Sequence, residues 1–263
     1  MASKEIIRDL YGGRIHVVHN PDARGRQPRY LINGEIKPKG VTTIMGQTLF
    51  KNLMQWAVDS CVNFLRDKLP VITEEDLLAG AKAHTTLRDK GASTGSEAHA
   101  MVEQFLKDEQ VQKGSKEATA AYLAFVKWFE EKQPEILGVE EVIYSEKYNY
   151  AGTYDCMLRI DGVTYLCDLK TTNPSRDAPK GVYAENFIQL GAYALAHTEQ
   201  RETDTDLAEI NDLMVISAKK NGVLDIVTAS DLELTVDDCS RTFKLVLGLY
   251  GFMQATTNKL KGK

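Results

Sequence analysis

The stretch from Gly152 to Thr172 constrains the fold more than any other part of the sequence. Two runs rich in aromatic and aliphatic residues flank Asp161-Gly162, a dipeptide that strongly favours a two-residue β-hairpin turn. A type I′ turn at this point sets a register in which Asp155 lies directly opposite Asp168. Because side chains alternate along a strand, Lys170 shares the face of both aspartates. The sequence therefore predicts a hairpin that gathers two acids and a lysine.

The two faces of this hairpin differ in character. One face is continuously apolar and is expected to be core, whereas the other carries the charges and is expected to be polar. In the predicted register Asp155 and Asp168 form a non-hydrogen-bonded pair, with Cβ atoms roughly 4.5–5.5 Å apart. The apolar face comprises Tyr154, Cys156, Leu158 and Ile160 opposite Val163, Tyr165, Cys167 and Leu169.

Two like charges so close destabilise a hairpin unless a cation compensates them, and Mg²⁺ or Mn²⁺ prefers carboxylate oxygens. Lys170, about 6–7 Å further along the face, adds a charge that can stabilise attack on a phosphodiester. An Asp-x-Lys sequence alone more often indicates a surface ion pair. The register and the division of the faces favour a metal-dependent catalytic site.

Composition limits the protein class. The chain has 263 residues, 43% of them hydrophobic and 26% charged, which is ordinary for a globular protein. No apolar run approaches the roughly 20 residues of a membrane-spanning helix, and the first residues lack the apolar core of a secretory signal. An intracellular, cytoplasmic location is expected, in the host cytoplasm if the protein is viral.

The cysteine pattern argues against a metal cluster. Cys61, Cys156, Cys167 and Cys239 contain no Cys-x-x-Cys pair, so neither a zinc site nor an iron–sulfur cluster is expected. Cys156 and Cys167 oppose each other across the predicted hairpin. A disulfide between them is conceivable, but an intracellular location favours two buried thiols.

Charge is unevenly distributed, although the net charge is −5. Residues 14–51 contain seven Lys or Arg and two Asp or Glu, whereas residues 199–212 contain six acids and one base. The basic region, with Arg24, Arg26 and Arg29, can follow a nucleic-acid backbone while the acidic loop stays in solvent. An unevenly charged, solvated surface is an equally good interpretation.

The order of predicted elements indicates an α/β protein. Two strands, 15–18 and 30–32, precede an Asn33-Gly34 turn and a helical region of about 49–69 that Thr42 or Thr43 can cap. A helix opens at Thr73, the pattern breaks at Gly91–Gly95, and helices follow to about 112 and over 116–132. The remaining elements are strands at 140–148, 152–160 and 163–171, a helix at 183–198, a hairpin of strands 212–219 and 224–228, and a helix at 235–256.

This order predicts one domain over residues 1–263. It comprises a basic β-rich segment (1–48), a helical part (49–135), a catalytic sheet core (136–230) and a C-terminal helix (231–263).

Two helices carry polar residues at one-turn spacing. Gly95, His99 and Glu103 are spaced one helical turn apart and therefore share a helix face. The glycine permits another backbone or a substrate to come close to the imidazole. Gln189 and Tyr193 are likewise one turn apart. Taken alone, a helix histidine is usually structural. Glu103 is interpreted as a packing residue or a support of the site. Gln189 and Tyr193 are equally well explained as a polar stripe beside the core.

Together these residues resemble the PD-(D/E)XK nuclease superfamily, and specifically its RecB-like exonuclease branch, which includes phage and mitochondrial single-strand exonucleases. The resemblance spans about residues 41–195. It rests on Gly95-x-x-x-His99, Gly152-Thr-Tyr-Asp155, Asp168-Leu-Lys170-Thr-Thr and Gln189-x-x-x-Tyr193, supported by Val41-Thr-Thr-Ile-Met and Gln55-Trp56-Ala. Asp168 stands where many relatives have Glu, which the family pattern permits.

The resemblance implies a restriction-endonuclease-like αβββαβ core, a central mixed sheet flanked by helices, here with a helical N-terminal half. It implies that Asp155 and Asp168, with His99 and the Leu169 backbone carbonyl, bind Mg²⁺ or Mn²⁺, and that Lys170 assists catalysis. Gln189, Tyr193, Glu103 and Thr171 would support the site or the substrate. Some members of the branch carry an iron–sulfur cluster, but this chain lacks the cysteine spacing.

Three functions fit this interpretation. The first is a DNA exonuclease of phage or bacterial type that acts in replication, recombination or repair. The second is an endonuclease, structure-specific or defence-related, on the same core, and the third is a nucleic-acid-binding protein that has lost activity. The presence of Asp155, Asp168 and Lys170 argues against the third. Single- or double-stranded DNA ends are the expected partners, and an oligomer is compatible with the sequence.

Overall fold

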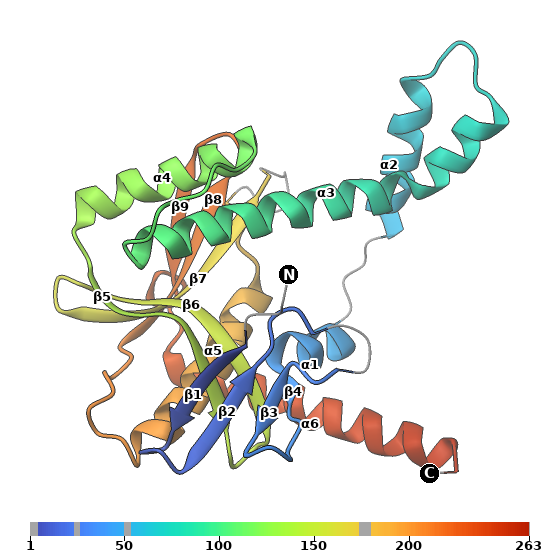
Figure 1. The fold of residues 1–263 in the computed structure, drawn as a ribbon. Coiled ribbons are helices and arrows are strands. Elements are labelled where there is room, and N and C mark those ends of the chain that lie inside the picture. The colour runs from blue at the N-terminus through green and yellow to red at the C-terminus, as the bar shows by residue number, and fades with distance from the viewer. Residues whose placement is uncertain (1–4, 24–26, 50–53, 174–179, 263) are drawn as a thin grey trace.

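The computed structural model describes residues 5–23, 27–49, 54–173 and 180–262 (Figure 1). Its strands are β1 (Ile6–Leu10), β2 (Ile15–His19), β3 (Tyr30–Ile32), β4 (Lys39–Gly40), β5 (Glu135–Ser145), β6 (Tyr150–Ile160), β7 (Val163–Thr172), β8 (Asp212–Lys219) and β9 (Leu224–Thr228). Its helices are α1 (Val41–Thr48), α2 (Met54–Arg66), α3 (Glu74–Leu106), α4 (Lys116–Lys132), α5 (Ala184–Arg201) and α6 (Val236–Leu260), with a 3₁₀ turn at Ser230–Leu232.

A central mixed sheet forms the core of the fold. Its strand order is β4-β6-β7-β8-β9, and β5 also pairs with β6. The β6–β7 hairpin turns at Asp161 and Gly162, both with positive φ, and pairs Ile160 with Val163 and Cys156 with Cys167. The predicted turn and register are therefore confirmed as far as the bonded pairs extend. After β7 the chain crosses over through α5 and returns as β8, parallel to β7. This α/β sheet with helices on its faces confirms the expected fold class.

Both faces of the β6–β7 hairpin are buried, which corrects the expectation of one apolar and one polar face. Cys156, Cys167 and Leu169 pack in one cluster with apolar residues of α3 and α4. On the other face Met157 and Leu166 pack in a second cluster with residues of α1, α5 and α6. The charged residues therefore lie within a covered sheet rather than on an open surface.

Two local predictions about helices are wrong. The helix α3 continues without a break from Glu74 to Leu106, through the predicted break at Gly91–Gly95. Each glycine costs a helix only about 1 kcal/mol, which the burial of Ala98, Met101 and Val102 against the sheet outweighs. Thr42 and Thr43 are not caps, because they lie inside α1 and Gly40 occupies the N-cap position.

The predicted start of α3 is confirmed. Thr73 caps this helix in a capping box with Asp76, in which the Thr73 side chain accepts from the Asp76 backbone N–H and the Asp76 carboxylate accepts from Thr73.

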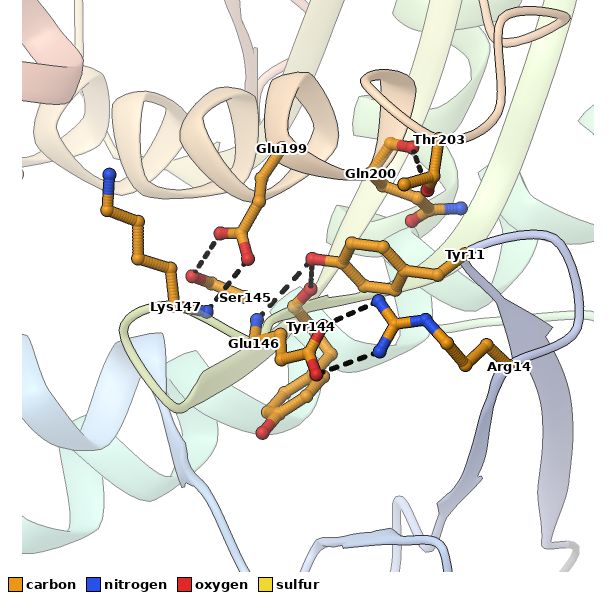
Figure 2. A network of polar contacts seen from close by, with 9 residues as sticks. All are labelled: Tyr11, Arg14, Tyr144, Ser145, Glu146, Lys147, Glu199, Gln200 and Thr203. Atoms are coloured by element: carbon orange, nitrogen blue, oxygen red, sulfur yellow. Dashed lines mark hydrogen bonds and ion pairs between the residues drawn. The ribbon is translucent and has the colours of Figure 1, made fainter.

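A second, three-stranded sheet of β1, β2 and β3 packs on the outer part of β5 and β6. Figure 2 shows the polar contacts that fasten it. The Tyr11 hydroxyl donates to the Tyr144 carbonyl at 2.9 Å, and Arg14 forms a bidentate pair with Glu146. Glu199, at the end of α5, accepts from the Ser145 hydroxyl and from the Lys147 backbone. The tip of the β5–β6 hairpin thus joins the N-terminal sheet to α5.

Two helical regions extend away from the sheets. Figure 1 shows α2 with the first half of α3 projecting on one side, and the C-terminal end of α6 projecting below it. None of the helices in the described ranges combines the length and apolar character that crossing a membrane requires.

Candidate active site

Asp155 is held from two directions. Its Oδ2 accepts a 2.6 Å hydrogen bond from the backbone N–H of Leu169 on β7. Its Oδ1 lies 3.7 Å from Nδ1 of His99, which α3 presents from above the sheet. The structure therefore brings together His99 and Asp155, which lie 56 positions apart in the sequence.

Asp168 and Lys170 form a largely buried ion pair. The Lys170 ammonium lies 2.7 Å from both carboxylate oxygens of Asp168, and its hydrogen-bond geometry is satisfied only at Oδ1. The Asp168 side chain is 3% exposed and its Oδ2 accepts no hydrogen bond, whereas Lys170 is 28% exposed. The lysine therefore remains accessible while the acid is shielded.

The four charged groups perturb one another's protonation. Burial raises the pKa of Asp168 to about 6, with Asp155 adding to the shift and Lys170 opposing it. Burial also disfavours the charged form of Asp155, yet His99 and Lys170 together hold its pKa below the ordinary value. Burial opposes charge on Lys170 too, but Asp168 and Asp155 keep its pKa above normal. Lys170 is consequently a hydrogen-bond donor at neutral pH, not a base.

Gln189 and Tyr193 lie on the same side of the sheet as Lys170. The Gln189 amide donates to the Tyr193 hydroxyl at 2.8 Å, and the Tyr193 ring packs so closely on Gly152 that a Cβ there would lie 2.5 Å from it. A pocket of about 250 Å³ has both Lys170 and Gln189 in its wall. Gly152 is thus required by the approach of Tyr193, and Gln189 of this pair borders the same pocket as Lys170.

Arg29 lines a second pocket, beside the candidate site. This pocket of about 210 Å³ is lined by Arg29, Tyr30 and His19 from the N-terminal sheet, and by Thr153 and Tyr193 from the core. Arg29 is exposed and donates to the Pro21 carbonyl. Arg24 and Arg26 lie outside the described residues.

The comparison with known families agrees with this geometry. The family model for the PD-(D/E)XK nuclease superfamily matches residues 64–231, well over half of the chain. The chain belongs to the PD-(D/E)XK nuclease superfamily. No curated protein matches the sequence. Members of this superfamily are hydrolytic nucleases that generally use divalent metals such as Mg²⁺ or Mn²⁺, and their substrates are nucleic acids.

The donor set of this PD-(D/E)XK protein fits such a metal. Within the described residues, no three His, Cys, Asp or Glu side chains already converge as a metal-ligand group. However, Oδ2 of Asp168 is buried and accepts no hydrogen bond, which leaves it a lone pair that a cation can use. The N–H and C=O of a strand residue point to the same edge, so the Leu169 carbonyl lies on the Asp155 side. Carboxylates, a carbonyl and an imidazole suit Mg²⁺ or Mn²⁺.

Glu140 is a further candidate site residue that no sequence motif indicated. The β5–β6 register pairs Val139 with Cys156 and Glu141 with Tyr154, so Glu140 lies opposite Asp155 on the side away from Asp168. Its backbone has φ +52°, a left-handed conformation that costs a side-chain-bearing residue roughly 1–3 kcal/mol. Burial raises its pKa to about 8, with Asp155 and Glu103 contributing. Glu140 and Asp155, from neighbouring strands, also line the same small cavity.

The remaining predicted residues have different environments. Glu103 pairs with Lys107 at 2.6 Å and lines a small cavity with His99 and Glu140. The Thr171 hydroxyl is buried and has no hydrogen-bond partner among the described residues. A Cβ at Gly95 would meet no atom within 4 Å, so no described protein segment requires this glycine. Close approach of a substrate to Gly95 stays a prediction.

Proposed function

We propose that this protein is a metal-dependent DNA exonuclease that acts in replication, recombination or repair. Two contacts carry the proposal. The Asp155 carboxylate accepts a hydrogen bond from the Leu169 N–H, between Asp168 and Lys170, and the Lys170 ammonium donates to Asp168. This places two acids and one accessible lysine within one short stretch of two strands, as hydrolysis of a phosphodiester requires.

Each residue has a defined task in this proposal. Asp155, Asp168 and the Leu169 carbonyl would hold a Mg²⁺ or Mn²⁺ ion, with His99 as a further ligand. The bound cation supplies Lewis-acid polarisation of the phosphate and a more acidic water. Lys170 stays protonated and donates to the scissile phosphate as charge builds on its oxygens. Water attacks phosphorus and gives up one proton to solvent, the P–O bond to the departing nucleotide breaks, and the leaving oxygen takes a proton from solvent.

The preference for an exonuclease rests on residues outside the two acids and the lysine. His99, Gln189 and Tyr193 belong to the motifs that resemble the RecB-like exonuclease branch, and all three lie at the site. Two pockets adjoin the site, one with Lys170 and Gln189, the other with Arg29 and Tyr193. Both offer room for nucleotides on either side of a scissile bond.

The deciding experiment compares an end-labelled linear DNA with a covalently closed circle of the same sequence, in Mg²⁺ and in Mn²⁺. We expect nucleotides to be released from the linear DNA and the circle to survive. Cleavage of the circle at a comparable rate would show an endonuclease, and metal-independent cleavage would refute the assigned site. Lys170→Ala, which should be inactive on both substrates, is the control for contaminating nucleases.

A further inference from the structure

Helix α1 begins without a side-chain cap. Gly40 occupies its N-cap position and has no side chain that could accept from the first backbone N–H groups of the helix. An α-helix has no internal acceptor for these groups, and its dipole makes this end partly positive. The proposed reaction uses no residue of the Val41-Thr-Thr-Ile-Met sequence that forms this end. The N-terminus of α1 is therefore a positive group with no task so far.

This end of α1 lies between two pockets. Val41 and Thr42 both line the pocket of about 210 Å³ that Arg29 borders, called the Arg29 pocket below. Thr42 also lines the pocket of about 250 Å³ that contains Lys170, the Lys170 pocket. Thr153, in the wall of the Arg29 pocket, precedes Asp155 by two positions on β6, which is about 6–7 Å along a strand. The Arg29 pocket is thus the neighbour of the candidate active site.

A buried imidazole in the wall of the Arg29 pocket has an unused nitrogen. His19 is only 6% exposed, and its Nδ1 is buried and has no hydrogen-bond partner among the described residues. The ring stacks on Tyr30, with centroids 4.8 Å apart and planes inclined by 13°, which fixes its orientation. Buried polar atoms nearly always have a partner. A neutral imidazole can carry its proton on Nδ1, so this atom can donate to a ligand.

The other groups of the Arg29 pocket favour an anion. Arg29 is exposed and donates from one nitrogen to the Pro21 carbonyl, and a guanidinium has five N–H donors in all. Thr153 adds a hydroxyl. Among the described residues Glu140 is the one acid in this wall, and it also lines the small cavity beside Asp155. A full positive charge, a helix dipole and neutral donors thus stand against a single carboxylate.

We propose that the Arg29 pocket binds one phosphate group of the substrate strand, held by the N-terminus of α1, Arg29 and His19. The inference rests on the proposed function, because the DNA supplies the phosphate, and it adds how the strand is held on one side of the cut. The group is either a terminal monophosphate or the phosphodiester next to the scissile one, since both present the same charged oxygens. Thr42 separates this phosphate from the scissile phosphate at Lys170, as suits successive phosphates of one strand.

The test measures binding without cleavage, by fluorescence anisotropy of labelled oligothymidylates in EDTA. One strand ends in a 5′-phosphate, one in a 3′-phosphate and one in hydroxyls alone, and a further series replaces single internal phosphates by neutral methylphosphonates. We expect one terminal phosphate, or one internal phosphate, to strengthen binding about tenfold. A terminal effect identifies a monophosphate as the occupant, and an internal effect identifies a phosphodiester. A wild-type protein for which no single phosphate stands out overturns the proposal.

Gly40→Asp is the most specific variant. A carboxylate at the N-cap stabilises a helix, so the fold should be retained, but it occupies the N–H groups and repels phosphate. A Cβ at Gly40 would lie 3.4 Å from the Tyr30 ring, so a side chain has room. The tenfold preference should disappear in Gly40→Asp and in Arg29→Gln. Its persistence in Gly40→Asp would exclude the end of α1 from the pocket and overturn the proposal.

Two comparisons isolate the charge effect. Gly40→Ala adds the same Cβ without a carboxylate, so the difference between the Ala and Asp variants measures charge rather than bulk. Lys37→Gln removes a positive charge from an exposed residue of the same basic region, outside the pocket wall, and should bind like the wild type. Urea denaturation of each variant confirms that the chain is folded. An equal loss of the preference in Gly40→Ala and Gly40→Asp would contradict an anion site.

The proposed function can fail separately from this inference. Cleavage of closed circles would refute the exonuclease, yet a phosphate preference that Gly40→Asp removes would still establish the phosphate site. Conversely, release of nucleotides from linear DNA by a protein without any phosphate preference would support the exonuclease and refute the site. The binding measurement in EDTA does not depend on a bound metal, so loss of the metal site cannot imitate either result.

Discussion

The backbone N–H of Leu169 donates its hydrogen bond to the side chain of Asp155, not to the backbone of the neighbouring strand. The bonded β6–β7 pairs end at Cys156 and Cys167, one position before the two acids. A carboxylate thus replaces a backbone acceptor where the sheet would otherwise continue. Leu169 stands between Asp168 and Lys170, so this bond fixes Asp155 relative to both of them. Geometry at the site depends on the backbone of β7 as much as on side chains.

Asp168→Asn should abolish cleavage while retaining the fold. The amide keeps the shape of the buried carboxylate but removes the charge that holds a divalent ion, and a loss of at least about 100-fold in single-turnover rate is expected. Quench-flow measurement on saturating DNA checks this. Activity near that of the wild type would refute the assignment of Asp168.

Lys170→Ala should be inactive and also less stable. It leaves the Asp168 carboxylate buried without a positive partner, which lowers the free energy of unfolding by up to about 3 kcal/mol. Mn²⁺ should restore part of that loss by taking the place of the ammonium charge. Urea denaturation with and without Mn²⁺ measures both effects, and an identical midpoint in all conditions would argue against this ion pair.

His99→Ala should weaken metal binding more than DNA binding. An imidazole ligand suits Mn²⁺ better than Mg²⁺, so residual activity should recover further in Mn²⁺. Isothermal titration with Mn²⁺, and fluorescence anisotropy with labelled DNA, separate the two affinities. Equal impairment in both metals across a wide titration would indicate that His99 only packs against Asp155.

Glu140→Gln should reduce nuclease activity and Mn²⁺ affinity, because it removes the third acid beside Asp155. Glu141→Gln is the matched control, since Glu141 follows directly in the chain but pairs with Arg8. We expect about a tenfold or larger effect at Glu140 and little change at Glu141, where a partly exposed ion pair contributes at most about 1 kcal/mol. Similar behaviour of the two variants would remove Glu140 from the site.

Reversal of the charges at Arg24, Arg26 and Arg29 should weaken binding of all DNA sequences about equally. Each lost phosphate contact lowers the slope of log affinity against log salt by roughly 0.7–0.9. Arg29→Glu alone should account for one contact, as Arg29 borders the pocket at the site. Salt titrations measured by anisotropy give the slopes. An unchanged slope in the triple variant would show that these arginines are solvated surface.

Stability should fall between pH 6.5 and pH 4 in part because of His19. Burial, with a smaller effect of Arg29, lowers its pKa to about 4, whereas the unfolded chain has the ordinary value near 6.5. The unfolded state therefore takes up the proton first as the pH falls. The contribution of His19 to the free energy of unfolding is fully present above pH 6.5 and is lost as the pH falls to about 4. The total loss is at most about 3 kcal/mol.

Thermal unfolding of the wild type and of His19→Gln across this range isolates the effect, since Asp168 titrates in the same range in both proteins. The variant should lose less stability on acidification. Parallel curves for the two proteins would contradict the assigned role of His19.

The parts of the fold with local signals were predictable from the sequence. Asp161-Gly162 determines the hairpin register, and the limits of α4, β8 and β9 match because their ends carry caps, a proline or an Asn-Gly turn. The prediction of a helical break at Gly91–Gly95 was wrong because the tertiary packing of α3 overrides the low helix propensity of glycine.

Glu140 could not be placed from the sequence. Its position depends on the β5–β6 register, and the connecting residues 146–149 contain neither Gly nor Pro to fix one. The burial of Asp168 was not predictable from the sequence either, because the helices that cover its face of the sheet include α5 and α6, which come much later in the chain.

The parallel pairing of β7 with β8 has a consequence during synthesis of the chain. The strand that carries Asp168 and Lys170 gains its second neighbour only after residues up to Lys219 have left the ribosome. Until then β7 is an exposed edge strand, which is prone to pair with other chains. The complete candidate site therefore forms late, once α5 and β8 have joined it. A nascent chain that stops before β8 should be inactive and prone to aggregation.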